Sequence, residues 1–266
     1  MTVAQRRKTA ACDTGRRRVT SLLQTRGLPA AAVVAIGFAV LARLMGAVTD
    51  GGALAGVVVA FVLMLAAGLA GFIPLGTVFL LTVATTRVGR ARKERLGVAE
   101  RRRGRTASQV LANLCVAALC ALPVVWLPRF SEVLLLAAMA ALAEAAADTV
   151  SSELGQATAN SAYMITDFRP AVLGTNGAIS VEGTLSGCIA ASIIAWVSSF
   201  AGLVEWRLTP IVALAGVAGM VLDSLLGATW ENAGRMGNDS VNFVSTAFAA
   251  DLALVAAVVV ERIGAH

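Results

Sequence analysis

ALAGVVVAFVLMLAAGLAGFIPLGTVFLLTVATT, residues 53–86, is a long apolar stretch without a single charged residue. A helix needs about 20 residues to cross the hydrocarbon core of a bilayer, so the stretch is too long for one ordinary span. Gly68, Gly71, Pro74 and Gly76 lie where it could break into two short helices. The stretch therefore predicts a membrane protein and leaves open whether it forms one helix or two.

The composition of the whole chain supports the same fold class. Of its 266 residues, 58% are hydrophobic and 14% are charged, which is too apolar for an ordinary soluble domain. Inside lipid, backbone groups must be hydrogen-bonded within the protein, so only helical bundles and closed barrels can span a bilayer. The apolar stretches are continuous rather than alternating. We therefore expect an all-α, polytopic transmembrane helical bundle.

About seven apolar segments have a length near that of a span, and the ambiguity of the longest one widens the range to about six to eight. The expected spans are 28–48, 53–86, 107–127, 131–150, 183–204, 207–227 and 241–260. The expected organisation is a basic cytoplasmic N-terminal tail at 1–27, followed by a single transmembrane catalytic domain at 28–262. Within it, the small-residue face GVAG at 216–219 allows either close helix packing or a homodimer.

The basic residues predict an orientation. RVGRARKERLGVAERRRGR, residues 87–105, is the densest basic block, and short Lys/Arg-rich loops stay on the cytoplasmic side. We interpret the basic segment 1–26 as a second cytoplasmic block that is attracted to anionic lipid, and not as a signal peptide. An even number of crossings then separates the blocks, which favours one long or tilted helix at 53–86. The carboxyl terminus would then lie on the external side. We expect the protein to be integral to the cell (inner) membrane.

Few residues could bind a soft metal ion or act through a histidine side chain. The four cysteines are Cys12, Cys115, Cys120 and Cys188. They lack CxxC or metal-ligand spacing, so we expect them to pack without a disulfide. The sole histidine is His266, which argues against a His-ligated zinc site. The only lysines are Lys8 and Lys93, and there is no GxxxxGK[ST] loop, so phosphates must be met by arginines, helix amino termini or a metal.

The first polar motif is ALAEAAADTVSSELG, residues 141–155. Helical spacing places Glu144, Asp148 and Ser152 on one face, with Ser151 beside them. A carboxylate in a membrane helix costs about 2.5–3.5 kcal/mol on insertion scales and by default indicates a function. The alternative is a helix-end charge that reaches the interface. We predict that Asp148 is catalytic and that Ser152 contacts a ligand.

The second motif is GTNGAISVEGTLSG, residues 174–187, which opens an apolar helix. Its candidate binding residues are Asn176, Gly177, Ser180, Gly183 and Thr184. A helix amino terminus binds phosphate well, and Glu182 is a candidate catalytic and metal-binding carboxylate. The alternative is a plain helix cap, in which Ser180 accepts backbone N–H bonds and Glu182 is stabilised by the helix dipole.

The third motif is VLDSLLGATWENAGRMGNDSVNF, residues 221–243. It contains Asp223, a candidate catalytic carboxylate near the end of one span, together with Glu231 and Asp239. Asn238 and Asn242 are candidate substrate- or nucleotide-binding residues. The order of an acidic residue at a helix end, a glycine-bearing loop and a polar opening of the next helix resembles that of the first two motifs. If this is an internal repeat, Asp148, Glu182, Asp223 and Asn242 converge on one divalent cation. Hard oxygen ligands favour Mg²⁺ or Mn²⁺ carried with a nucleotide.

RTASQVLAN, residues 105–113, supplies a candidate phosphate contact. Arg105 lies at the mouth of a span, with Arg169 and Arg235 as further candidates behind it. A polar stripe of Thr106, Gln109 and Asn113 enters the bilayer from there. Such a stripe either joins helices together or lines a binding surface, and for the second alternative we name Asn113.

In order, RTASQVLAN, ADTVSSELG, GTNGAISVEGT, DSLLGATWE and NDSVNFVST resemble the family of plant phytyl-phosphate kinase and the animal transmembrane protein nineteen group, over roughly residues 40–260. The resemblance implies a polytopic membrane enzyme that acts on an isoprenoid phosphate. The VEGT element is also similar to that of CTP-using phytol and dolichol kinases, which implies CTP as donor. Carried across, Asp148, Glu153, Glu182, Asp223 and Asp239 match the acidic positions of these motifs. Gly237 departs from the Asp-Asn-Asp pattern of many members.

We therefore expect an isoprenoid monophosphate kinase that transfers a γ-phosphoryl group from CTP to a membrane prenyl phosphate, with Mg²⁺ or Mn²⁺ bound by Asp148, Glu182, Asp223 and Asp239. Its expected partners are the bilayer, the prenyl or phytyl phosphate and the nucleotide, without nucleic acid, and its site is expected to face the cytoplasm. Two alternatives remain: a cytidylyltransferase that forms a CDP-lipid, and a transporter, for which Asp251 within the last span would be the main argument.

Overall fold

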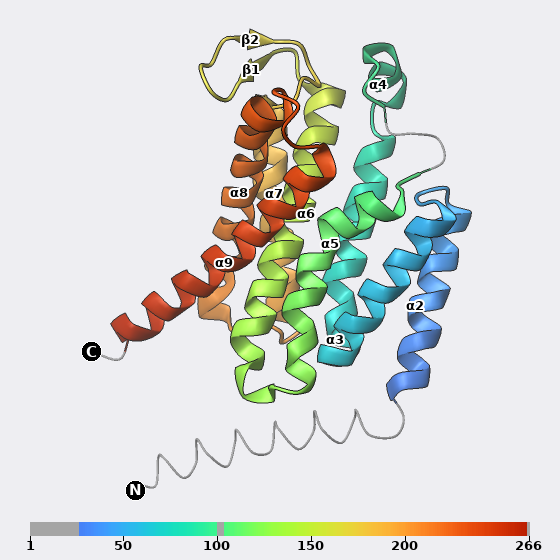
Figure 1. The fold of residues 1–266 in the computed structure, drawn as a ribbon, viewed down its shortest axis with the longest axis vertical. Coiled ribbons are helices and arrows are strands. Elements are labelled where there is room, and N and C mark those ends of the chain that lie inside the picture. The colour runs from blue at the N-terminus through green and yellow to red at the C-terminus, as the bar shows by residue number, and fades with distance from the viewer. Residues whose placement is uncertain (1–26, 100–103, 265–266) are drawn as a thin grey trace, which may run out of the picture.

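The computed structural model describes residues 27–99 and 104–264, and it forms a bundle of long helices with a short helix and a small sheet at one end (Figure 1). The helices are α2 (Gly27–Leu44), α3 (Asp50–Arg87), α4 (Arg90–Leu96), α5 (Ala107–Ala121), α6 (Ser131–Thr158), α7 (Val181–Phe200), α8 (Thr209–Leu226) and α9 (Asn238–Gly264). Shorter helical segments are η1 (Leu122–Val125), η2 (Pro128–Phe130), η3 (Trp206–Leu208) and the π-helix η4 (Gly227–Glu231). The strands are β1 (Ala162–Met164), β2 (Pro170–Ala171) and β3 (Ala178–Ile179), in the order β2-β1-β3.

Within the described residues, six helical segments are long and apolar enough to cross a membrane, and the apolar helix Leu28–Leu44 is shorter. The six are α3, α7 and α9 together with α5, α6 and α8, each of the last three extended by neighbouring 3₁₀ or π-helical turns. This confirms the predicted polytopic helical bundle. The expected tail 1–27, with Cys12, lies outside the described residues except for its last residue.

The long apolar stretch at residues 53–86 forms two helices. Gly68 has φ 63° and ψ −154°, outside the helical region, and a positive φ of this kind favours glycine. A Cβ on Gly71 would lie 2.4 Å from the backbone oxygen of Leu63, although residues eight apart in a straight helix are separated by about 12 Å. At the other end of α3, Arg87 donates a hydrogen bond to the Met45 carbonyl at 3.5 Å. The chain therefore turns back at Gly68 and returns to the end where α3 began.

This turn overturns the predicted topology. The expectation of one long or tilted helix at 53–86 is wrong, because α3 contributes two antiparallel helices. The two basic segments consequently join the bundle at opposite ends: α2 begins at the end away from α4 (Figure 1). Helix α9 finishes at the same end of the bundle (Figure 1). The start of α2 and the finish of α9 are therefore on the same side of the bundle, whereas the sequence analysis predicted opposite sides. We call the end with α4 and the sheet the site end.

Helix α6 is the centre of the bundle. Residues 136–147 are all buried, and most of them are alanine, whose small side chain lets neighbouring helices approach closely. A Cβ on Gly219 of α8 would lie 2.5 Å from Glu144 Cγ, and one on Gly216 would lie 2.9 Å from the Ala143 carbonyl carbon. The small-residue face 216–219 therefore packs against α6 within the chain, which is one of the two uses that the sequence left open.

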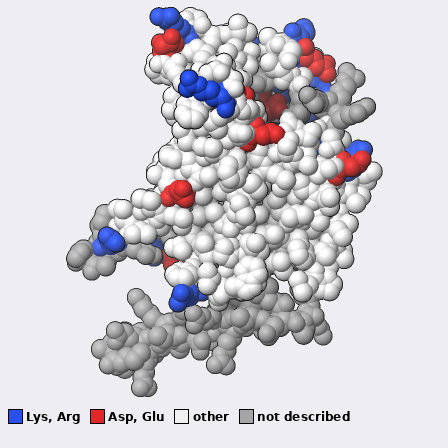
Figure 2. All heavy atoms as spheres, in the orientation of Figure 1, with Lys and Arg blue, Asp and Glu red and all other residues white. Residues whose placement is uncertain are grey.

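The surface agrees with a bilayer position between two polar ends. Figure 2 shows charged side chains gathered toward the two ends of one face, with a broad, almost uncharged band between them. At the end opposite the site end, the exposed rings of Trp196, Phe200 and Trp206 contact one another, with centroids 4.8 Å apart for Phe200 and Trp206. Tryptophan collects at membrane interfaces, so this cluster indicates where the bilayer ends.

Candidate active site

A polar cavity of about 270 Å³ lies at the site end, lined by α5, α6, α8, α9 and the segment between α6 and α7. It brings together most of the predicted site residues, from motifs more than 130 positions apart in the sequence. These are Arg105, Asn113, Asp148, Ser152, Glu153, Asn176, Gly177, Ser180, Asp223, Asn238 and Asn242. The predicted residues that do not line it include Glu182, Gly183, Thr184 and Asp239.

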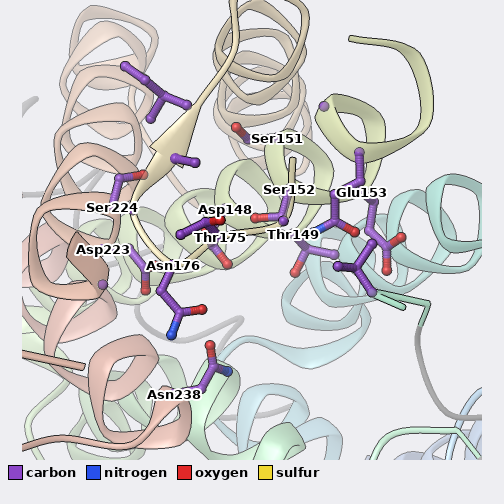
Figure 3. A pocket seen from close by; sticks show the side chains of 18 of the residues that line it. Asp148, Thr149, Ser151, Ser152, Glu153, Thr175, Asn176, Asp223, Ser224 and Asn238 are labelled. Atoms are coloured by element: carbon purple, nitrogen blue, oxygen red, sulfur yellow. The ribbon is translucent and has the colours of Figure 1, made fainter. Parts of the chain in front are cut away.

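Two carboxylates from different helices face the cavity. Asp148 of α6 and Asp223 of α8 both line it, and Figure 3 shows them beside the same space, with Asn176 and Asn238 converging from other segments. Asp223 Oδ2 accepts a hydrogen bond from the buried Ser245 Oγ at 3.2 Å, which fixes its orientation. Two carboxylates that face one space repel each other, and this favours a cation or cationic ligand between them.

Glu144 lies behind this pair, one helical turn deeper along α6. It is 1% exposed and within electrostatic reach of both Asp148 and Asp223. No hydrogen-bond partner for its buried Oε1 exists among the residues that the structure describes. A buried carboxyl oxygen without a partner is costly, so Glu144 offers an unused polar atom behind Asp148 and Asp223.

Arg105 provides positive charge opposite Asp148. Its guanidinium interacts electrostatically with the Asp148 carboxylate and donates a 3.5 Å hydrogen bond from Nη1 to Thr149 Oγ1. The backbone of Arg105 is fixed as well, because its N–H bonds the Ala47 carbonyl at 3.0 Å and its carbonyl accepts from Thr49 N–H at 2.9 Å. The loop between α2 and α3 therefore positions the arginine that we expected to contact phosphate.

The polar stripe that follows Arg105 has two uses. Thr106 caps α5 in a reciprocal capping box with Gln109, whose side chain accepts from the Thr106 N–H at 2.8 Å. Gln109 and the largely buried Asn113 also line the cavity, and Asn113 Nδ2 donates to the Gln109 carbonyl at 2.9 Å. The stripe is therefore both a structural start of α5 and part of the cavity wall.

The segment between α6 and α7 forms the outer wall of the cavity. β1 pairs with β2 and β3, and the loop before β3 carries Thr175 and Asn176 into the lining. Gly177 has φ 78°, and a Cβ there would lie 2.4 Å from the Ala228 nitrogen at the start of η4. Asn232 Nδ2 also donates to the Asn176 carbonyl at 3.1 Å. The loop is thus held against the end of α8 by close backbone approach.

The SVEG sequence, residues 180–183, forms the amino-terminal cap and first turn of α7, and it packs tightly against α6. Ser180 is the N-cap of α7 and accepts a 3.1 Å hydrogen bond from Gly183 N–H, as the plain capping alternative predicts. A Cβ on Gly183 would lie 2.7 Å from the Ser151 carbonyl oxygen. Glu182, one position earlier, is exposed. Glu182 and Thr184 therefore occupy the helix start outside the cavity lining.

We predict that Gly183→Ala destabilises the protein, because the new methyl group meets backbone rather than a movable side chain. Overpacking of this kind costs about 1–3 kcal/mol. The control is Gly37→Ala on α2, where a Cβ meets nothing within 4 Å. Thermal unfolding in detergent should show a lower midpoint for Gly183→Ala than for Gly37→Ala. Equal midpoints for the two variants would contradict the close α6–α7 contact.

Glu153 matches an acidic position of the family motifs, and it forms an ion pair with Lys93 of α4. Lys93 is 1% exposed, and its Nζ lies 2.5 Å from Glu153 Oε2. Lys93 also donates to the carbonyls of Thr85 and Thr86, and Thr86 Oγ1 donates to Glu153 Oε1 at 2.9 Å. The Glu153 carboxylate thus ties the end of α3 and α4 to α6 at the edge of the cavity.

Several further polar residues line the cavity without having been predicted as site residues. They are Gln109, Thr149, Ser151, Gln156, Thr175, Ser224 and Glu231. Gln156 continues the spacing of Asp148 and Ser152 by one more turn, so helical periodicity could have identified it. The predicted candidates Arg169 and Arg235 are exposed and do not line the cavity, and neither does the exposed Asp251 of α9.

Within residues 27–99 and 104–264, no group of three or more His, Cys, Asp or Glu side chains is arranged to hold a metal ion. The four-carboxylate cluster expected from the sequence is not assembled, because Glu182 and Asp239 lie outside the cavity that contains Asp148 and Asp223. Cys115, Cys120 and Cys188 are free thiols.

Several known proteins are similar in sequence to this chain over more than two thirds of its length. An uncharacterized membrane protein of Synechocystis sp. is 33% identical over 200 residues, which covers 74% of this chain and 78% of the relative. Protein VTE6, chloroplastic, of Arabidopsis thaliana is 31% identical over 195 residues, which covers 71% of this chain and 59% of that longer protein. An uncharacterized membrane protein of Methanocaldococcus jannaschii is 31% identical over 189 residues, which covers 71% of this chain and 77% of the relative. No solved structure matches the chain significantly.

The family model described as integral membrane protein DUF92 matches residues 33–250. This range includes every residue that lines the polar cavity. The match confirms the family resemblance predicted from the ordered motifs. The chain belongs to the DUF92 family of integral membrane proteins.

Proposed function

We propose that this protein is a prenyl monophosphate kinase, which transfers the γ-phosphoryl group of CTP to a membrane prenyl phosphate of the phytyl type. One observation carries the proposal: Asp148, Asp223 and Arg105 line a single polar cavity at the end of a membrane bundle. Lipid phosphate groups lie at the membrane surface, so a cavity at the end of the bundle can take up both a lipid phosphate and a nucleotide from water. The motif resemblance to phytyl-phosphate kinases supports the substrate class, and the SVEGT element at 180–184 supports CTP.

In the proposed reaction, an oxygen of the acceptor phosphate forms a bond to the γ-phosphorus. The bond between that phosphorus and the β–γ bridging oxygen breaks, and CDP leaves. The acceptor phosphate is already anionic, so the reaction needs no strong base, and positioning and charge neutralisation are the main tasks of the protein. This agrees with a cavity that contains hydroxyls, amides, carboxylates and one arginine among its described residues.

Arg105 is the residue that we assign to phosphate. Its guanidinium can bind two phosphate oxygens at once, and its fixed backbone lowers the cost of ordering it. The hydroxyl of Thr149 and the amide of Asn113 lie in the same wall and can donate further hydrogen bonds. Asn176, Asn238 and Asn242 line the cavity from the outer loop and α9, where we place the nucleotide.

Asp148 and Asp223 are the residues that would hold Mg²⁺ or Mn²⁺. Mg²⁺ in nucleotide enzymes is commonly bound by one or two carboxylates together with the substrate phosphates, which suits two cavity-facing carboxylates better than a complete protein cage. The unpartnered Oε1 of Glu144 places a further buried carboxyl oxygen behind them. When bound, the ion would neutralise phosphate charge.

We propose that the site end faces the cytoplasm of the cell (inner) membrane. Nucleoside triphosphates are available there. The helix ends that surround the cavity also carry a dense group of basic residues, as short cytoplasmic segments do. In the described part of the chain these include Arg87, Arg90, Arg92, Lys93, Arg95 and Arg105.

The test is phosphoryl transfer by the purified protein in detergent. The protein is incubated with Mg²⁺, γ-labelled CTP or ATP, and phytyl, geranylgeranyl or farnesyl monophosphate. We expect label in the prenyl diphosphate. Transfer of α-label from CTP into the lipid product would instead establish a cytidylyltransferase. No transfer of either label by folded protein would exclude both reactions and leave transport, although the exposed position of Asp251 outside the cavity gives that alternative little support.

A further inference from the structure

A second, apolar cavity of about 90 Å³ lies beside the polar one, and α2 and α3 form one of its sides. Its walls come from α2, both halves of α3, α5 and α6, and they include Phe38, Gly56, Phe79 and Leu114. None of the α2 or α3 residues that line it belongs to the polar cavity. These helices therefore form a compartment that the phosphate chemistry does not use.

The two cavities meet at three residues. Arg105, Asn113 and Thr149 line both of them. The remaining wall of the apolar cavity is hydrocarbon or glycine except for Thr82. A phosphate-binding arginine at the junction of a polar and an apolar compartment matches a molecule with a phosphate head and a hydrocarbon tail.

We propose that the apolar cavity holds the phosphate-proximal isoprene units of the acceptor, and that this cavity selects for a prenyl chain; this rests on the proposed function. With the phosphate at Arg105, the first carbons of the tail must pass between α2, α3 and α5. Leu75 and Val83 both line the cavity and are eight residues apart on one helix, so the cavity extends about 12 Å along the bundle. Beyond it the tail continues into lipid.

Gly56→Leu tests the assignment, because its side chain enters the cavity. A Cβ at Gly56 meets nothing within 4 Å, so the backbone accepts the substitution. The matched control is Gly37→Leu on α2, an exposed helical glycine with equally open surroundings that does not line the cavity. We expect Gly56→Leu to lower the ratio of the rate with geranylgeranyl phosphate to the rate with dimethylallyl phosphate by roughly tenfold or more. Gly37→Leu should leave this ratio at the wild-type value.

A binding measurement separates this proposal from the proposed function. A geranylgeranyl phosphate analogue with a diazirine in its second isoprene unit is photolysed with the full-length protein in detergent, and the labelled peptides are identified by mass spectrometry. We expect label on α2 and α3 around Phe38 and Phe79, competed by unlabelled geranylgeranyl phosphate and reduced in Gly56→Leu but not in Gly37→Leu.

Label spread over lipid-facing residues, or equal label in Gly56→Leu and Gly37→Leu, would overturn the tail site even if phosphoryl transfer is observed. Competition by a straight-chain alkyl phosphate as strong as that by geranylgeranyl phosphate would overturn the selection for isoprenoids. Specific label in a protein without phosphoryl transfer would retain the tail site and reject the kinase.

Discussion

Asp223→Asn is expected to lower the rate of phosphoryl transfer by roughly 10²–10³-fold, the size of effect seen when one preorganised electrostatic group is removed from an active site. The amide has the shape of the carboxylate, so it can still accept the hydrogen bond from Ser245 Oγ. It lacks the negative charge with which Asp223 would hold the divalent cation. The measurement is γ-label transfer from CTP at saturating acceptor.

Thermal stability distinguishes this functional role from a structural one. Asp223 is half-buried near Asp148 and Glu144, and a neutral amide costs less to bury there than a carboxylate. We expect the unfolding midpoint of Asp223→Asn to equal or exceed that of the wild type. Asp251→Asn on the exposed face of α9 is the control and should change neither rate nor midpoint. A lower midpoint together with a modest loss of rate would indicate that Asp223 is structural.

Lys93→Met is expected to destabilise the protein by about 3–5 kcal/mol, because removal of one partner from a buried ion pair leaves the other charge without compensation. The Nζ of Lys93 bonds Glu153 and two carbonyls at the end of α3, and methionine replaces none of these contacts. A loss of this size is a large part of the total stability of a typical domain. It should appear as a marked fall in the unfolding midpoint in detergent.

Two further variants isolate the ion pair. Arg95→Met removes an exposed positive charge from the same short helix and should have little effect. Glu153→Gln in the Lys93→Met background removes the stranded charge, so the double variant should recover part of the lost stability, as a double-mutant cycle measures. Equal midpoints for Lys93→Met and Arg95→Met would show that the pair does not hold α4 against α6.

The sequence determined the bundle and much of the site, for reasons that act locally. Continuous apolar segments predicted the spans, and their predicted ends agree with those of α7, α8 and α9 within four residues, whereas α6 continues eight residues past its predicted end. Helical spacing and position near a helix end predicted Asp148, Asp223 and Arg105, which line the polar cavity. The depth of a residue in the membrane depends only on its distance along the chain from the helix end, so it can be counted from the sequence.

The tertiary structure decided the direction in which each residue faces. Gly183 and Gly187 both pack against α6, and successive helix residues are rotated by about 100°, so Glu182 is turned away from the cavity. In the same way Asn238 and Asn242 line the cavity, while Asp239 between them does not. The rotation of a helix about its axis is set by the partners that it packs against, and the sequence of one helix does not specify them.

The same reason explains the turn at Gly68 and the ion pair between Lys93 and Glu153. Several residues in the apolar stretch were candidates for a break, and the packing of residues 50–67 against 69–87 and α2 selected one of them. Lys93 and Glu153 are 60 positions apart and meet only because α3 returns to the site end. The sequence by itself determined which segments span the membrane and how deep their polar residues lie. Only the tertiary structure decided which of those residues meet, because that depends on contacts between helices distant in the chain.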